Sequence, residues 1–288
     1  MTDERPTLDE LVERWRSDLE AWAIPTEILA GAATPPWVMP SPLFGRRADE
    51  QLEAPHGHSY QAALNALPEG GTVLDVGAGA GAASLPLAVA RHGSIIAIDT
   101  SRDMLTGLAE RAQQLDVPAR LIAGRWPEAS DVLLTRDEGE VADVVVCHNV
   151  LYNIRDLPPF LLALDRCAGT RVVIELTEVP PPSALNPLWA RFHGLSRPDR
   201  PTAAAVFEIV EAMGLRPKMR SWAHEVATPY DDFAAAVEIT RIRLCLPEQR
   251  SGEVADALLE LGVDPGEPYL PGTRQRNVVT IWWDHPTG

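Results

Sequence analysis

The chain has 288 residues, of which 45% are hydrophobic, and carries 25 lysines and arginines against 41 aspartates and glutamates. This length suits one large α/β domain, or one domain with a smaller attachment, and allows a sizeable core. The net charge of −16 repels phosphate backbones, and no dense basic run is present, so we do not expect nucleic acid as a partner.

Two helices are predicted in residues 1–68, which we interpret as an N-terminal cap. The apolar residues of 7–22 recur at helical spacing, and Thr7 with Glu10 forms a capping-box pattern. A second helix is predicted over about 57–67. The N-terminal residues lack an apolar signal core, and no segment approaches 18 uninterrupted apolar residues, so we expect neither a secretion signal nor a membrane span.

A segment rich in proline and tryptophan, residues 33–44, lies between these two helices. Proline excludes it from a helix interior, and its aromatic side chains need burial, so we expect it to wrap over the main domain. His56 and His58 follow and resemble a two-histidine metal pair. No third ligand stands beside them, so we expect a loop or helix cap there and no metal site.

From residue 72 onward, continuous apolar strands alternate with helical segments. Strands are predicted at 72–76, 94–98, 119–123, 142–147, 171–176, 217–226 and 277–283. Helices are predicted up to about residue 92 and over 101–114, 156–166 and 202–213, with a helical insertion over about 230–262 before the last strand. This alternation indicates an α/β fold with a mostly parallel sheet covered on both faces, and we assign it to a single domain, 69–288.

Three cysteines, Cys147, Cys167 and Cys245, are scattered along the chain, and none lies in a CxxC pair. We therefore expect a reduced, cytoplasmic protein without structural zinc or disulfide bonds.

The stretch VLDVGAGAGAAS, residues 73–84, places three glycines at alternate positions between a predicted strand and a predicted helix. Glycines there let the backbone turn sharply and approach a ligand closely. The pattern fits the dinucleotide fingerprint, with Asp99 about 20 residues on, but it also fits an adenosyl ligand without phosphate. Asp75 favours the second ligand, because a carboxylate before the turn would repel a pyrophosphate and suit an ammonium and a sulfonium.

Three segments resemble the motifs of class I S-adenosylmethionine-dependent methyltransferases. They are VLDVGAGAG, IIAIDTSRDML and VADVVVCHNVLYNIRDL, and the resemblance covers residues 70–225 with the C-terminal strand as an added match. The resemblance implies an enzyme with S-adenosyl-L-methionine as cofactor. It also implies a seven-stranded, mostly parallel sheet flanked by helices, with an antiparallel C-terminal strand.

The cofactor site implied by this resemblance comprises Asp75, Gly77, Ala78, Gly79, Gly81, Asp99, Thr100, Met104, Arg125, Trp126, His148 and Asn149. The glycine turn would bend around the methionine portion, with Asp75 orienting the turn and the ligand amine. Asp99 would accept hydrogen bonds from both ribose hydroxyls, or cap the helix at 101 if Ser101 does not. Met104 would pack near the adenine or in the core. Arg125 stands where similar enzymes often have an acidic residue for the adenine amino group, and Trp126 could stack on adenine or lie in the core.

For catalysis the candidates are His148, His193 and Tyr152. His148 could remove a proton from a hydroxyl or amine acceptor, or else support the loop. His193 is the second candidate base, or else has a structural role at the surface or in the core. Tyr152 would bound the acceptor pocket, and Asn149 would bond backbone or cofactor. Glu175 and Glu178 could recognise a cationic acceptor or be solvated.

We therefore predict a methyltransferase acting on an O or N atom of a small-molecule acceptor. An RNA methyltransferase, a nicotinamide-dependent oxidoreductase and a non-catalytic S-adenosylmethionine-binding regulator remain as alternatives. The segment after residue 147 also lacks the Asp/Asn-Pro-Pro-Tyr pattern of methylases that act on base nitrogens. No membrane partner is expected, and a homodimer is left open.

Overall fold

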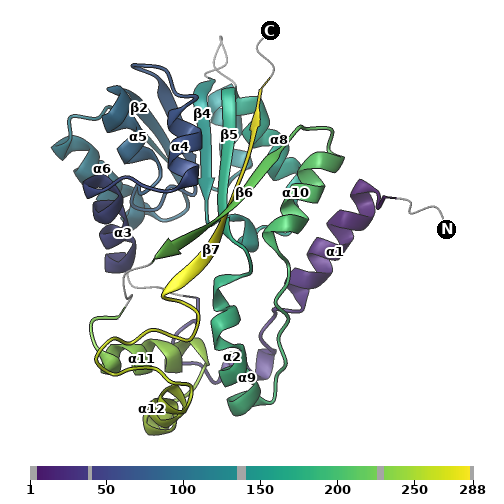
Figure 1. Ribbon diagram of the computed structural model, residues 1–288, viewed down its shortest axis with the longest axis vertical. Coiled ribbons are helices and arrows are strands. Elements are labelled where there is room, and N and C mark those ends of the chain that lie inside the picture. The colour runs from purple at the N-terminus through teal and green to yellow at the C-terminus, as the bar shows by residue number, and fades with distance from the viewer. Residues whose placement is uncertain (1–4, 38–40, 135–140, 226–229, 286–288) are drawn as a thin grey trace.

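The computed structural model describes residues 5–37, 41–134, 141–225 and 230–285. A seven-stranded sheet with the order β3-β2-β1-β4-β5-β7-β6 forms its centre (Figure 1). The strands are β1 (Thr72–Val76), β2 (Ser94–Asp99), β3 (Ala119–Ala123), β4 (Ala142–His148), β5 (Ala168–Thr177), β6 (Lys218–Glu225) and β7 (Gln275–Asp284). Neighbouring strands among β1–β5 are parallel, whereas β7 runs antiparallel to both β5 and β6. The predicted mostly parallel sheet with an antiparallel C-terminal strand is confirmed.

Helices cover both faces of this sheet. They are α1 (Leu8–Glu20), α2 (Thr26–Ala30), α3 (Ser41–Glu53), α4 (His58–Leu64), α5 (Ser84–Arg91), α6 (Arg102–Gln114), α7 (Asp131–Leu134), α8 (Leu157–Cys167), α9 (Asn186–His193), α10 (Ala203–Ala212), α11 (Phe233–Arg243) and α12 (Ser251–Glu260). Alternate side chains of β1 point to opposite faces of the sheet. Val73 belongs to the hydrophobic cluster that includes residues of α4, and Leu74 belongs to the one that includes residues of α1, α8 and α10. None of the helices in the described ranges is long and apolar enough to cross a membrane.

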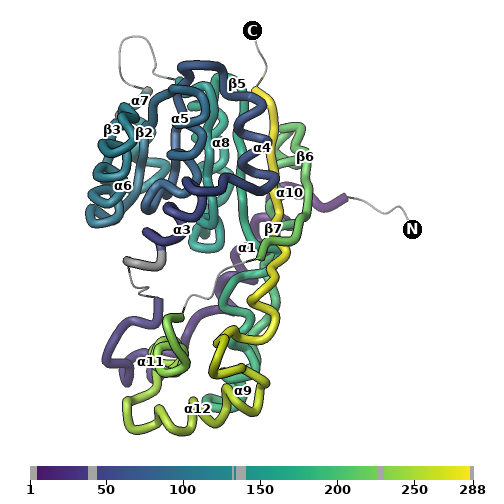
Figure 2. The backbone as a smooth tube through the Cα atoms, turned by 60° about the vertical axis from the view of Figure 1, so that its left-hand side comes forward, coloured from purple at the N-terminus to yellow at the C-terminus, as the bar shows by residue number. Residues whose placement is uncertain are grey.

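The helical insertion and nearby segments form a second core below the sheet (Figure 2). Helices α9, α11 and α12 share buried residues that include Trp189, Val237 and Leu258. Ile24 and Ile28, near the N-terminus, pack against the same cluster. The first 68 residues thus contribute to both cores, and their assignment as a separate cap stays a prediction.

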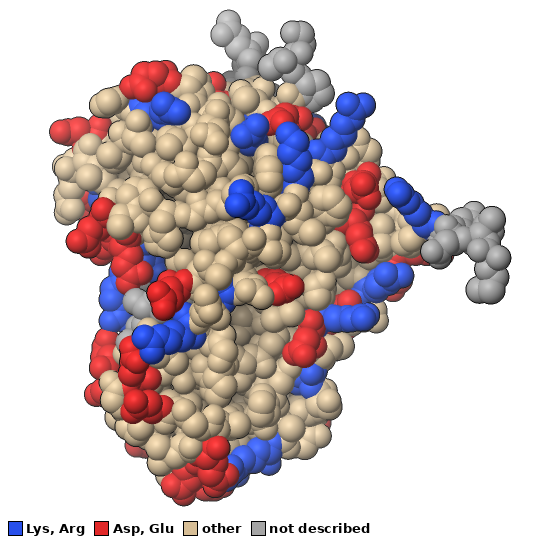
Figure 3. Space-filling model, in the orientation of Figure 1, with Lys and Arg blue, Asp and Glu red and all other residues tan. Residues whose placement is uncertain are grey.

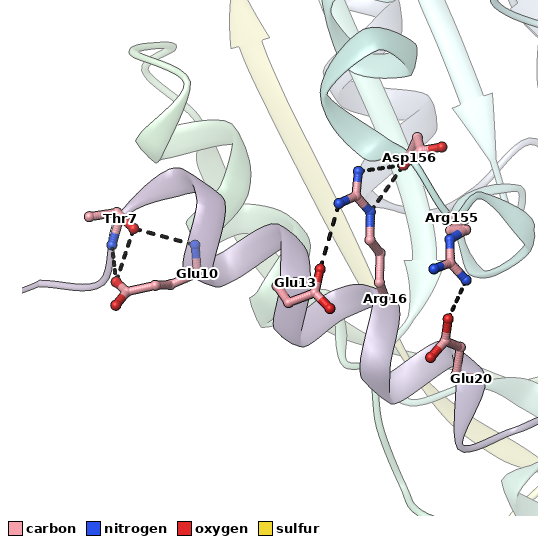
Figure 4. Close-up of polar contacts among 7 residues, drawn as sticks. All are labelled: Thr7, Glu10, Glu13, Arg16, Glu20, Arg155 and Asp156. Carbon is pink, nitrogen blue, oxygen red and sulfur yellow. Dashed lines mark hydrogen bonds and ion pairs between the residues drawn. The ribbon is translucent and has the colours of Figure 1, made fainter.

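Helix α1 is fixed to the loop that follows β4 (Figure 4). The capping box of Thr7 and Glu10 is present, as predicted. Arg16 Nη2 lies 2.6 Å from Asp156 Oδ1, and the Trp15 indole donates a hydrogen bond of 2.8 Å to the Ile154 carbonyl. Trp15 is only 1% exposed, so α1 contributes both to the core and to the placement of this loop.

The expectation for residues 33–44 was partly wrong. Helix α3 already begins at Ser41, because Pro42 falls in its first turn, where the missing N–H is not needed. Trp37 is 69% exposed and is not covered as expected. Residues 38–40 lie outside the described residues.

We expect Trp15→Ala to lower the free energy of unfolding by about 3–5 kcal/mol, since it empties a buried aromatic site. Trp37→Ala is the matched control and should change stability by less than about 0.5 kcal/mol, because that ring is exposed. Urea titration of both variants measures the difference. Equal losses would contradict the proposed role of Trp15.

Candidate active site

A cavity of about 430 Å³ lies at the carboxyl ends of β1, β2, β4 and β5 and extends over β6 and β7. Helix α3 contributes Phe44, Arg47, Glu50 and Gln51 to its lining. Predicted site residues that the structure brings together along this cavity are Asp75, Gly77, Ala78, Gly79, Asp99, Met104, His148 and Asn149. Ligands of open α/β sheets bind at this edge of the sheet. The cavity is therefore the candidate active site.

The glycine turn after β1 uses its own amide groups within the protein. Gly77 and Ala78 donate hydrogen bonds to the Ile98 carbonyl, at 2.8 and 3.1 Å, and Gly79 donates to Asp99 Oδ2 at 2.8 Å. Gly77 and Gly79 have φ of +74° and +52°, a conformation that favours glycine. These three amides are therefore already engaged and are not free donors for a phosphate.

Asp75 occupies the N-terminus of α5. Its side chain is 1% exposed, and its Oδ2 accepts a hydrogen bond of 2.6 Å from the hydroxyl of Ser84, the first residue of that helix. Burial raises the pKa of Asp75 to about 6, against the opposing effect of the Ser84 hydrogen bond. In dinucleotide-binding folds a pyrophosphate lies at the corresponding helix N-terminus. Here a carboxylate of the protein takes that place.

Asp99 ties the glycine turn to the start of α6. Its Oδ1 accepts a hydrogen bond from the Ser101 amide at 2.8 Å, and its Oδ2 accepts the one from Gly79. Ser101 itself caps α6, because its hydroxyl accepts a hydrogen bond from the Met104 amide. A carboxylate has about four acceptor sites, so Asp99 keeps acceptor capacity toward the cavity.

His148 and Glu175 lie side by side in the cavity. They are paired residues of the parallel strands β4 and β5, so their side chains project from the same face of the sheet. The Nε2 atom of His148 is buried and has no hydrogen-bond partner among the described residues. Asn149, with φ of +59°, donates its amide to the Glu175 carbonyl at 2.7 Å and locks the two strand ends together. Buried polar atoms are normally paired, so His148 Nε2 is positioned to meet a ligand.

The far end of the cavity is built by β6 and β7, which no sequence motif marks. His224 pairs with Arg276, and Trp222 pairs with Val278, so all four side chains share one face. The rings of His56 and His224 lie 5.0 Å apart, with His56 Nε2 3.2 Å from His224 Nδ1. His58 packs instead on the ring of Trp282. His56 and His58, which resemble a metal pair in the sequence, therefore have different neighbours.

Two predicted catalytic residues lie away from the cavity. Tyr152 stacks on Trp15 and donates a hydrogen bond of 2.6 Å to the Thr177 carbonyl, and burial raises its pKa. This side chain braces the β4 loop against the end of β5. His193 belongs to the second core, where its Nε2 lies 2.6 Å from the Leu244 carbonyl. Of the two roles considered for His193, this position favours the structural one.

Several predicted cofactor residues also lie off the cavity. Trp126 is buried in the main core and donates a hydrogen bond of 3.1 Å to the Phe160 carbonyl, so it packs on α8 and not on an adenine. Thr100 and Arg125 are exposed outside the lining. Gly81 is buried, and a Cβ there would lie 2.6 Å from a methyl group of Leu85, so its role is close packing. Glu178, considered for acceptor recognition, instead accepts a hydrogen bond from the Asn277 side chain.

Residues 67–186 match the family model of a methyltransferase domain. This segment of the chain is therefore similar to methyltransferase domains. The glycine turn, Asp75, Asp99 and His148 all lie within the matched segment. No curated protein matches the sequence.

Two solved structures share the fold of this chain. The YcgJ protein from Bacillus subtilis gives a TM-score of 0.52 at 16% identity, covering 81% of this chain and 100% of its own. A Bacillus halodurans protein provisionally assigned as a methyltransferase gives a TM-score of 0.53 at 15% identity, covering 80% of this chain and 97% of its own. At these identities the likeness establishes the class I fold alone.

Substitutions at Gly77 and Gly79 should differ in their cost to stability, because the two positions differ in packing. A Cβ at Gly77 would lie 2.3 Å from Val150 Cγ2, whereas a Cβ at Gly79 meets nothing within 4 Å and enters the cavity. We expect Gly79→Ala to cost about 1–2 kcal/mol of stability through its backbone conformation. Gly77→Ala should cost about 1–3 kcal/mol more, because it also overpacks the site. Urea titration tests this order, and a larger loss for Gly79→Ala would contradict it.

Proposed function

We propose that this protein is an S-adenosylmethionine-dependent methyltransferase that methylates an O or N atom of a small molecule. The observation that carries the proposal is the pair of carboxylates around the glycine turn. Asp75 fills the N-terminus of α5, and Asp99 holds the Gly79 amide. A cavity end with two carboxylates and engaged amides suits a cationic adenosyl ligand and disfavours a pyrophosphate.

The residues present fit this cofactor. Asp99 would accept hydrogen bonds from the ribose hydroxyls, Asp75 would face the ligand amine, and Met104 would lie against the adenine. The turn at Gly77 and Gly79 presents bare backbone to the methionine portion. When bound, S-adenosylmethionine supplies a methyl group made electrophilic by its positively charged sulfur.

His148 and Glu175 are the groups that would handle a proton. The unpartnered Nε2 of His148 can accept a proton from a hydroxyl or amine held above the end of β4. Glu175, next to it across the strand pair, can stabilise the imidazolium that forms. Because the electrophile is already activated, alignment of the acceptor and exclusion of water are the main tasks of the protein.

The charge distribution supports a small acceptor over RNA. Acidic and basic side chains are interspersed on the face drawn in Figure 3, with no single basic patch on it. The net charge of −16 also opposes binding of a polyanion.

Calorimetry with S-adenosylmethionine, S-adenosylhomocysteine and NADH tests the cofactor assignment. We expect both adenosyl ligands to bind and NADH not to bind. Asp99→Asn should weaken adenosyl binding by roughly tenfold or more, because one charge-assisted acceptor is lost. Binding of NADH without the adenosyl ligands would overturn the proposal. Transfer of a labelled methyl group to a small molecule in cell extract would separate an enzyme from a regulator.

The affinity for S-adenosylmethionine should depend on pH through Asp75. In the free protein this carboxyl has a pKa of about 6, and a bound ammonium favours its ionised form and lowers that pKa. Binding therefore releases a proton below about pH 6, and affinity should fall as the pH drops, by at most about tenfold per pH unit.

The matched variant is Asp75→Asn, which should flatten this pH dependence. Adenosine, which lacks the amino acid portion, should bind the wild-type protein with little change over the same range. A slope that persists in the Asn variant would remove Asp75 as its source. Calorimetry in buffers of different ionisation enthalpy also measures the proton release directly.

A further inference from the structure

Two arginines line the far end of the cavity without a partner. Arg47 on α3 and Arg276 on β7 both belong to the lining, and neither forms a hydrogen bond or an ion pair with any described residue. The contrast with the neighbouring Arg46 is direct, because Arg46 Nη1 lies 2.6 Å from Asp231 Oδ1. An arginine side chain without a partner carries five unused donors.

These arginines also lie close to one another. Burial lowers the pKa of Arg276 most, and the positive charges of Arg47 and Arg243 lower it further. The pKa of Arg243, at the end of α11, is lowered by burial and also by the positive charge of Arg47. Clustered cations repel one another, and this cluster occurs in a chain with a net charge of −16. The arrangement costs stability in the free protein, which is typical of a binding site.

The carboxylates nearby do not neutralise the pair. Glu50 and Glu175 act on Arg47 electrostatically, but neither forms an ion pair with it. Glu175 lies beside His148 at the end of β5, between the arginines and the cofactor end. Arg47 and Arg276 form the basic end of the cavity, which also contains Glu50 and Glu175, whereas Asp75 and Asp99 line the end at β1 and β2.

A rigid aromatic wall stands at the basic end. The Trp222 indole donates a hydrogen bond of 3.0 Å to Thr280 Oγ1, which fixes the plane of the ring. Gly57 packs directly on that ring, since a Cβ there would lie 2.5 Å from it. The wall and the two guanidinium groups together form a surface for a flat or apolar molecule with an anionic substituent.

We propose that the methyl acceptor carries an oxyanion, a carboxylate or a phosphate, which Arg47 and Arg276 bind. The inference rests on the proposed function, because it assigns the basic half of the cavity to the acceptor. With its anion on the arginines, the acceptor extends over Trp222 toward Glu175 and His148. Its nucleophilic atom then lies at the end of β4, where the cofactor half begins. Arg47 and Arg276 set acceptor specificity and take no part in proton transfer.

The test is calorimetry of the full chain saturated with S-adenosylhomocysteine and titrated with either orthophosphate or benzoate. We expect at least one of these anions to bind, and their relative affinities distinguish a phosphate from a carboxylate acceptor. Arg47→Gln and Arg276→Gln should each weaken that binding by about tenfold, which corresponds to about 1.4 kcal/mol. Arg216→Gln lies in an exposed loop outside the cavity lining, is the matched control and should leave the binding unchanged.

Three further measurements separate loss of the anion contact from general damage to the protein. The affinity for S-adenosylhomocysteine should be the same in all variants, because the arginines lie at the opposite end from Asp75 and Asp99. The melting temperature of Arg47→Gln should be unchanged or higher, since removing one cation relieves repulsion. Arg47→Lys should retain the charge but lose the two-pronged contact, and bind with intermediate affinity.

Binding of neither anion would overturn the inference, and so would anion binding that both arginine variants leave intact. Failure of S-adenosylhomocysteine to bind would instead overturn the proposed function, and it is measured separately in the same samples.

Discussion

The buried carboxylate at the first turn of α5 decides what the cavity can hold. Asp75 accepts a hydrogen bond from the Ser84 hydroxyl at the first turn of α5, so a carboxylate of the protein lies where an anionic ligand would otherwise approach the helix N-terminus. The glycine turn follows from the same arrangement, because its amides donate to Ile98 and Asp99. This arrangement is the reason why we propose a positively charged ligand and not a phosphate-bearing one.

The rest of the site depends on how strand ends are held together. Asn149 joins β4 to β5, and Tyr152 joins the following loop to Thr177. Trp15 stacks on Tyr152 and donates a hydrogen bond to the Ile154 carbonyl in that loop. His148 therefore sits on a segment fixed from two directions. Its Nε2 has no hydrogen-bond partner among the residues that the structure describes. Rigid support of this kind is what an alignment-based reaction requires.

The sequence predicts the cofactor half of the cavity well, for a physical reason. Buried parallel strands appear as continuous apolar runs, and the polar residues that follow them meet at one edge of the sheet. Asp75, Asp99 and His148 could be placed by that rule alone. The same rule says nothing of side-chain direction in loops, so the sequence leaves Trp126 open between the adenine and the core, and only the structure places it against Phe160. The two roles of His193 also stay open in the sequence, because the second core cannot be deduced from local patterns.

The acceptor half could not be predicted, because its residues come from segments without a motif. Arg47 lies on α3, a helix that the proline-rich sequence around its start does not predict. Arg276 and Trp222 are brought together only by the pairing of β6 with β7. Both arginines lie outside residues 67–186, the part that matches the family. In our proposal, the residues that bind the cofactor and the arginines that select the acceptor thus lie in different parts of the chain. Mutation can then change which molecule is modified while the nucleoside-binding half stays intact, so one ancestral scaffold can diversify its substrates without losing its chemistry.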